Sequence, residues 1–126
     1  MTVLYDDRCG FCRWFVSKIA AWDRTRRVRF APIRSAEGEA RLDGMDPTRR
    51  DSSWHLITRD GRVVSAGAAV PFLLRELPGG IPLSWVADAL PLTTDLAYCA
   101  VARRRGAFGR LLHLDGFDAC DVPVER

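Results

Sequence analysis

The sequence is poor in lysine. Of its 19 basic residues only Lys18 is a lysine, the others are arginines, and the formal net charge is +3. The arginines form no block interleaved with aromatic residues, which is the pattern of a surface that stacks on bases and binds phosphates. We therefore expect no nucleic acid partner.

Long apolar runs and secretory features are also lacking. The longest apolar stretch, residues 81–92, is interrupted by Pro82, Asp88 and Pro91, so it is too short to span a bilayer. The first residues show no charged segment followed by an apolar core and a cleavage site, as a secretory signal would. We therefore expect a cytoplasmic protein without membrane insertion.

Cysteine is scarce as well, with four in 126 residues. A chain of this length can bury a sufficient core without disulfides, and the cytoplasm keeps thiols reduced. Under those conditions a closely spaced cysteine pair is typical of catalysis or metal binding rather than of structural cross-linking. The pair Cys9 and Cys12 is therefore the first candidate for function.

The hydrophobic pattern predicts a single domain, 1–126, with a core of about 1–78 and a helical extension of about 81–126. In chain order we expect a strand over 2–5, a helix over 10–22, a strand over 28–31, a helix over 35–42, a hairpin of strands 54–58 and 62–66, and helices over 67–77, 83–90 and 92–105. The order β-α-β-α-β-β-α is that of a thioredoxin-like α/β fold with a mixed four-stranded sheet, here with additional C-terminal helices.

The same pattern also predicts details of individual helices and loops. Ser35 is a candidate N-cap for the helix over 35–42, which Gly38 weakens, and residues 43–53 are predicted to be a polar loop. Residues 108–114 should continue the last helix after a break at Gly106. The inward face of that helix should carry Leu96, Cys99 and Ala100.

Cys9 and Cys12 lie where a buried strand is followed by a helix. The first turn of a helix has unpartnered N–H groups and the positive end of the helix dipole, so a thiol there is pushed toward the reactive thiolate. Cys12 shares the apolar stripe of Phe15 and Ile19 and should point inward, whereas Cys9 precedes the stripe and should lie nearer solvent. This spacing favours Cys9 as the nucleophile and Cys12 as the resolving thiol.

Asp6 has two interpretations. It could shuttle a proton for Cys12, or it could accept hydrogen bonds from the turn as an Asx-type cap. Arg8 and Arg13 could each stabilise a thiolate, or could simply be solvated. Asp7 is interpreted as a turn residue.

The other cysteines leave alternatives open. Cys99 is expected to be a buried core thiol, and Cys120 is either a third redox thiol or an exposed cysteine without a catalytic role. A zinc site built from Cys9, Cys12, Cys120 and one histidine is a rival interpretation. A structural zinc site usually shows a second tight ligand pair, and this chain has none.

The motif Asp6-x-x-Cys9-x-x-Cys12, directly after Val-Leu-Tyr, resembles the signature of the DCC family of thiol-disulfide oxidoreductases. The likeness extends to further blocks, namely Phe30–Ile33 with Ser35 and Gly38, the hairpin over 54–66, Tyr98–Arg105, and Cys120–Pro123. The chain departs from the family at Asp7, where glycine is usual. Relative to thioredoxins, Ser52-Ser53 precedes the third strand where a proline would stand.

The resemblance implies a thioredoxin-like fold and a redox-active cysteine pair. Together with the spacing, it leads us to expect a thiol-disulfide oxidoreductase of the protein-disulfide reductase type, with Cys9, Cys12 and Asp6 as site residues and no bound cofactor or metal. Its partners would be a disulfide-containing protein or a small-thiol substrate, and an unidentified electron donor. The alternative is a non-catalytic thioredoxin-like binding module, with or without a cysteine-ligated metal.

Overall fold

The computed structural model describes residues 1–111, except the side chains of residues 105, 106 and 108–110. A four-stranded sheet forms its centre, in the order β2-β1-β3-β4. The strands are β1 (Thr2–Tyr5), β2 (Arg29–Pro32), β3 (His55–Ile57) and β4 (Val63–Ser65). β2 runs parallel to β1, whereas β3 is antiparallel to both β1 and β4. The predicted mixed, thioredoxin-like sheet is therefore confirmed.

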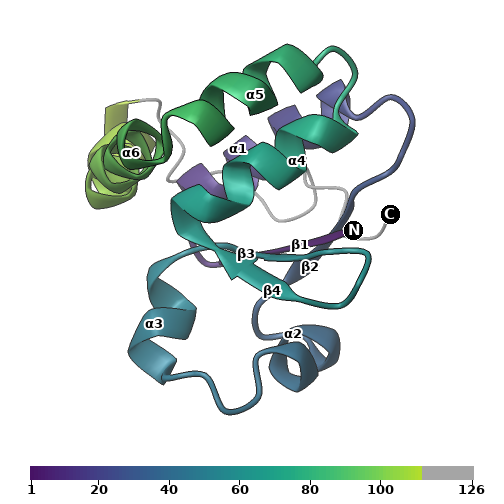
Figure 1. The fold of residues 1–126 in the computed structure, drawn as a ribbon. Helices are drawn as coiled ribbons and strands as arrows, with labels where there is room; N and C mark the ends of the chain where they lie inside the picture. The colour runs from purple at the N-terminus through teal and green to yellow at the C-terminus, as the bar shows by residue number, and fades with distance from the viewer. Residues whose placement is uncertain (112–126) are drawn as a thin grey trace.

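Helices cover both faces of the sheet (Figure 1). On one side lie α1 (Gly10–Trp22), α4 (Val70–Glu76) and α5 (Ile81–Ala89), with α4 entered through a 3₁₀ turn, η1 (Ala66–Ala69). On the other side lie α2 (Ala36–Arg41) and α3 (Pro47–Ser52). The long α6 (Pro91–Leu111) packs against η1 and α1. Among residues 1–111, no helix combines the length and the apolar character needed to cross a bilayer.

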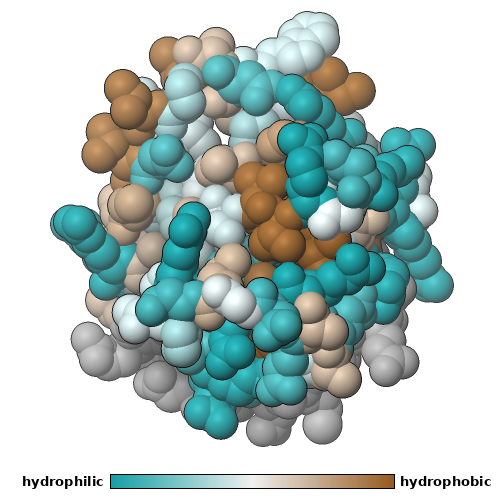
Figure 2. Space-filling view, turned by 60° about the horizontal axis from the view of Figure 1, so that its bottom comes forward, coloured by the Kyte–Doolittle hydropathy of each residue, from teal (hydrophilic) through white to brown (hydrophobic). Residues whose placement is uncertain are grey.

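Alternation along the strands divides the core in two. Val3 and Tyr5 face α1 and α4, in a cluster that also holds Ile19 and Leu73. The alternate residue Leu4 faces the side of α2 and α3, in a smaller cluster that consists of Leu4, Ala31, Ile33, Leu42 and Ile57. Figure 2 is turned so that this second side comes forward, and it shows apolar surface at the centre of a largely hydrophilic face. The larger cluster lies beside the cysteine pair.

A buried carboxylate shapes the connection from α1 to β2. Asp23 caps the C-terminal end of α1 and is fully buried. Its carboxylate oxygens accept hydrogen bonds from the backbone N–H groups of Arg27, at 3.1 Å, and Val28, at 2.9 Å. These bonds satisfy backbone N–H groups that the turn would otherwise leave unpaired, and they hold the chain where it enters β2.

Gly38 has a different role from the one that helix propensity suggests. Ser35 is the N-cap of α2, as predicted, since its hydroxyl accepts the N–H of Gly38 at 3.2 Å. However, a Cβ on Gly38 would lie 2.3 Å from the carbonyl oxygen of Ile33 and 2.6 Å from that of Pro32. The glycine therefore permits α2 to pack closely on the end of β2, although it lowers the intrinsic propensity of the helix.

The prediction of a polar loop over 43–53 was incomplete, because residues 47–52 form α3. Asp46 is its N-cap and accepts the N–H of Arg49 at 3.0 Å, and Pro47 occupies its first turn. Both are ordinary helix-start signals. The segment carries no apolar stripe, and none of its residues is buried. Periodicity therefore could not reveal it.

The predicted inward face of the last helix was wrong. Leu96 is 71% exposed, and Cys99 and Ala100 are exposed as well. Among the residues of α6 whose side chains the structure describes, the half-buried ones are Thr94, Tyr98 and Ala102, spaced four apart. Apolar residues occur all around this helix, so its stripe gave a poor guide to its packing.

The predicted break at Gly106 was wrong too, since α6 runs without interruption to Leu111. Cys99, expected to be a buried core thiol, lies instead on the exposed surface of this helix. The predicted roles of Cys120 and of the tail that contains it fall outside the described residues.

Candidate functional site

Cys9 and Cys12 sit at the start of α1, directly behind the end of β1. Cys9 is the N-cap residue, with extended backbone angles, and the helix begins at Gly10. The backbone N–H of Cys12 donates to the Sγ of Cys9 at 3.4 Å. The sulfur atom of Cys9 therefore occupies the place of a capping oxygen, within reach of the helix dipole.

The two cysteines differ in what they face more than in how much they are exposed. Both side chains are half-buried. Cys12 lines an apolar cavity beneath α1, in keeping with the inward direction predicted for it. Cys9 is not among the residues that line this cavity. The predicted contrast in solvent exposure is therefore small, and the clearer contrast is that only Cys12 meets the cavity.

Asp6 makes the turn contact that the sequence suggested and an ion pair that it did not. Its Oδ1 accepts the backbone N–H of Arg8 at 3.1 Å, as an Asx-type turn requires. The same oxygen accepts from Nη1 of Arg34 at 2.9 Å. Arg34 lies 28 residues along the chain, just after β2, so no local pattern could have indicated the pairing.

Arg34 alters the electrostatics of the turn. Its hydrogen bond with Asp6 raises the pKa of Arg34, so that its positive charge is retained. It also lies 3.5 Å from carboxylate oxygens of Asp7 and of Asp51. A carboxylate alone near the cysteines would oppose thiolate formation, and an adjacent guanidinium offsets that effect.

Asp7, which stands where the DCC family usually has glycine, does not have a positive φ angle. The turn therefore adopts a conformation open to any residue at this position. The carbonyl oxygen of Asp7 accepts a hydrogen bond from Nη1 of Arg13 at 3.4 Å, which links the first turn of α1 to the loop before it. Arg8, by contrast, is exposed.

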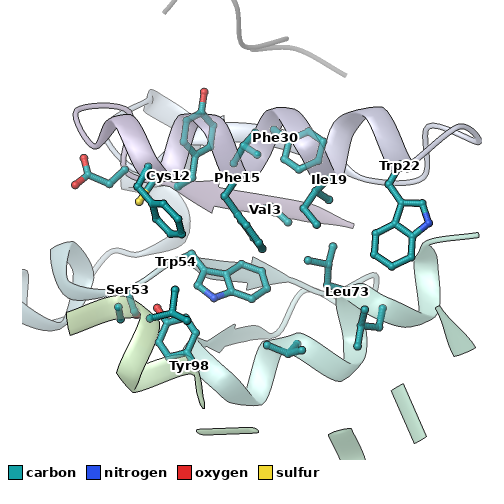
Figure 3. A pocket seen from close by; sticks show the side chains of 18 residues that line it. Val3, Cys12, Phe15, Ile19, Trp22, Phe30, Ser53, Trp54, Leu73 and Tyr98 are labelled. Carbon is teal, nitrogen blue, oxygen red and sulfur yellow. The ribbon is translucent and has the colours of Figure 1, made fainter. Parts of the chain in front are cut away.

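The cavity has a volume of about 330 Å³ and extends from Cys12 along the inner face of α1 (Figure 3). Its walls come from α1, the sheet, α4, α6 and the residues before β3. Those labelled in the figure are Val3, Cys12, Phe15, Ile19, Trp22, Phe30, Ser53, Trp54, Leu73 and Tyr98. Asp6 is the one charged residue among the described residues that line it.

Trp54 and Tyr98 are site residues that sequence reasoning missed. The sequence indicated Trp54 only as the first residue of the hairpin over 54–66, and Tyr98 only as part of the family resemblance in the last helix. Ser53 and Trp54 stand directly before β3. Residues 1–111 contain no cis peptide bond, so the chain before β3 has trans geometry. The aromatic rings of Trp54 and Tyr98 face the cavity from the side opposite Phe15 (Figure 3).

His55 has structural contacts. It is fully buried, its Nε2 lies 2.9 Å from the carbonyl oxygen of Arg50, and its Nδ1 lies 2.7 Å from the hydroxyl of Ser65. A carbonyl only accepts, so Nε2 carries the proton, and Nδ1 of the neutral ring accepts from Ser65. Burial lowers the pKa of His55. The neutral ring thus ties α3 to β4.

This histidine should make the protein less stable below neutral pH. Because its pKa is lower in the folded state than its ordinary value of about 6.5, the unfolded chain binds the proton first as the pH falls. The free energy of unfolding should therefore be level above about pH 7 and decrease as the pH falls from about 6.5 toward 5.5. Urea unfolding at pH 7.5 and 5.5 measures the difference, which His55→Gln should reduce. An undiminished difference in folded His55→Gln would contradict this assignment.

Metal ligands do not gather around the cysteines in the part of the chain that the structure describes. Among residues 1–111, no three histidine, cysteine or acidic side chains are placed to hold one ion. The zinc site considered from the sequence also needs Cys120, which lies outside these residues.

A mixed sheet of this order, with a Cys-x-x-Cys pair at the start of its first helix, defines a thioredoxin-like protein. A family model described as DCC1-like thiol-disulfide oxidoreductase matches residues 3–111. The protein therefore belongs to the DCC1-like thiol-disulfide oxidoreductase family, as its motif predicted. The family name implies thiols and disulfides as substrates. No curated protein and no solved structure matches the chain.

Proposed function

We propose that the protein is a thiol-disulfide oxidoreductase that reduces disulfides with Cys9 as the nucleophile and Cys12 as the resolving thiol. The observation that carries this proposal is the hydrogen bond from the N–H of Cys12 to the Sγ of Cys9. A donor aimed at sulfur at the positive end of a helix stabilises the thiolate more than the thiol. Membership of the family supports the same chemistry.

The proposed reaction has two exchange steps. The Cys9 thiolate attacks one sulfur of the substrate disulfide, forming a mixed disulfide and releasing the other sulfur as a thiolate. Cys12 then attacks the Sγ of Cys9, so that the Cys9–Cys12 disulfide forms and the second substrate sulfur leaves. Two electrons pass from the cysteine pair to the substrate, and the two thiol protons end on its sulfurs.

Asp6 is proposed as a positioning residue for this exchange. It holds the turn through Arg8 and pairs with Arg34. Asp6 and Cys12 line the same cavity, which supports the alternative role of Asp6, movement of a proton to or from that thiol. An external thiol donor would return the Cys9–Cys12 disulfide to the dithiol, and the exchange itself requires no bound cofactor.

Trapping of a mixed disulfide tests the assignment of the two thiols. In Cys12→Ser the first step can occur but the second cannot, so a dansylated cystine-containing peptide should remain attached to Cys9. Peptide mapping after acid quenching identifies the attachment site. In Cys9→Ser no adduct should form at Cys12 at a comparable rate. Equal adduct formation at either position would show that Cys9 is not the preferred nucleophile.

The rival function, a binding module with a cysteine-ligated metal, predicts different results. Stoichiometric zinc in the purified reduced protein, lost in Cys12→Ser, would favour it. Alkylation of Cys9 with the pH dependence of an unperturbed thiol would also count against the redox proposal, since we expect a thiolate at lower pH.

A further inference from the structure

The cavity beside Cys12 is larger than the exchange reaction itself requires. At about 330 Å³ it lies within the size range of sites for small organic ligands. It is also elongated, since Cys12 lies at one end and Trp22 at the other, with Phe15, Ile19 and Leu73 between them (Figure 3). A space of this form fits a chain that starts at the cysteine pair.

Its lining selects against charged substrates. Apart from the Asp6 carboxylate, the described lining residues carry no charge, and none of them is basic. Glutathione disulfide carries several carboxylates, which would need cationic partners and would be repelled by Asp6. An uncharged alkyl chain would bury apolar surface along the whole cavity at no such cost.

We propose that the substrate is a small disulfide carried on an uncharged alkyl chain, as in lipoamide, whose chain lies in the cavity while its sulfurs meet the cysteines at the Cys12 end. This rests on the proposed exchange activity and names the substrate class of that site. Cys9 does not line the cavity, but its Sγ lies 3.4 Å from the backbone N of Cys12, which does, so in this proposal the dithiolane extends out of the Cys12 end of the cavity to meet Cys9.

The reaction balances within the protein and this substrate. The Cys9 thiolate opens the dithiolane ring, giving a Cys9–substrate disulfide and a thiolate at the other end of the opened ring. Cys12 attacks the Sγ of Cys9, the Cys9–Cys12 disulfide forms, and the substrate leaves as a dithiol. Two electrons and the two thiol protons pass to the substrate, so one turnover needs no further reductant.

The two faces of α6 offer a matched pair of variants. Ala102 is half-buried and lines the cavity, so Ala102→Trp should fill it. Ala100 is exposed on the same helix and does not line it, so Ala100→Trp is the control. Oxidation of the pre-reduced protein by each disulfide is followed by acid quenching, alkylation and mass spectrometry, with lipoamide and the short 2-hydroxyethyl disulfide as probes.

For the wild-type protein we expect the rate to saturate with lipoamide and to remain linear with 2-hydroxyethyl disulfide. Ala102→Trp should slow the reaction with lipoamide by about tenfold or more, through loss of chain burial, and leave the short disulfide unchanged. Octanamide, which has the chain but no sulfur, should compete with lipoamide alone. This last measurement needs no variant to fold.

The outcomes separate the two proposals. If neither disulfide oxidises the cysteine pair, the proposed exchange activity itself fails. If 2-hydroxyethyl disulfide reacts normally but lipoamide shows no saturation and no competition by octanamide, the exchange activity stands and the substrate class is wrong. An equal loss with both probes in Ala102→Trp, together with absent competition, would likewise overturn the substrate class.

Discussion

Replacement of Cys9 by serine should lower the rate of disulfide reduction at least about 1,000-fold, to the rate of the reductant alone. A hydroxyl cannot form the mixed disulfide, so the first exchange step is lost rather than slowed. Reduction of insulin by dithiothreitol, followed by turbidity, measures the effect. The Cys9→Ser protein is informative because serine is itself a favoured N-cap, so α1 should still form.

Cys99→Ser is the matched control for this experiment. Cys99 is an exposed cysteine on α6, so its replacement should change neither the stability nor the rate. Circular dichroism and urea unfolding of both variants confirm that the fold is intact. Retention of the wild-type rate by folded Cys9→Ser would remove Cys9 as the nucleophile.

Replacement of Gly38 by alanine should destabilise the protein by about 3 kcal/mol, at the upper end of the cost of overpacking. The alanine Cβ would overlap the carbonyl oxygens of Ile33 and Pro32, and a backbone cannot yield as a flexible side chain does. Helix propensity alone predicts the reverse, a gain of about 1 kcal/mol. The sign of the change therefore decides between the two effects.

Ala40→Gly in the same helix measures the propensity effect alone, since Ala40 is exposed. Urea unfolding of both variants gives the comparison. We expect Ala40→Gly to cost about 1 kcal/mol and Gly38→Ala to cost clearly more. A Gly38→Ala variant more stable than the wild type would show that α2 can move away from β2. Because Arg34 lies between β2 and α2, such a shift would also disturb its ion pair with Asp6.

Local sequence patterns were sufficient to predict the helix and strands around the cysteine pair. β1 and α1 have the predicted bounds, and β3 and β4 form the predicted hairpin. These elements carry strong periods, of two or of about 3.6 residues, and each is bounded by its own turn or cap. The motif that identified the family also lies within one such junction.

Weakly patterned elements were not predictable in the same way. α3 has caps but no apolar stripe, and α6 has apolar residues on several faces, so the packing of Tyr98 and Ala102 depends on what lies opposite them. Gly38 looked unfavourable because its helix was considered without the strand that it touches. For α6 the deciding contacts come from the distant elements α1 and η1, and for Gly38 they come from the end of the preceding strand, β2.

The cysteine pair, its place at a helix start and its thioredoxin-like setting were therefore all present in the order and spacing of residues, because such features depend on near neighbours. The Asp6–Arg34 ion pair and the apolar cavity beside Cys12 were not, because they arise only where β2, α4, α6 and the residues before β3 fold against α1. Short-range spacing thus indicates which atoms can exchange disulfides, and long-range packing shapes the space that a substrate must fit.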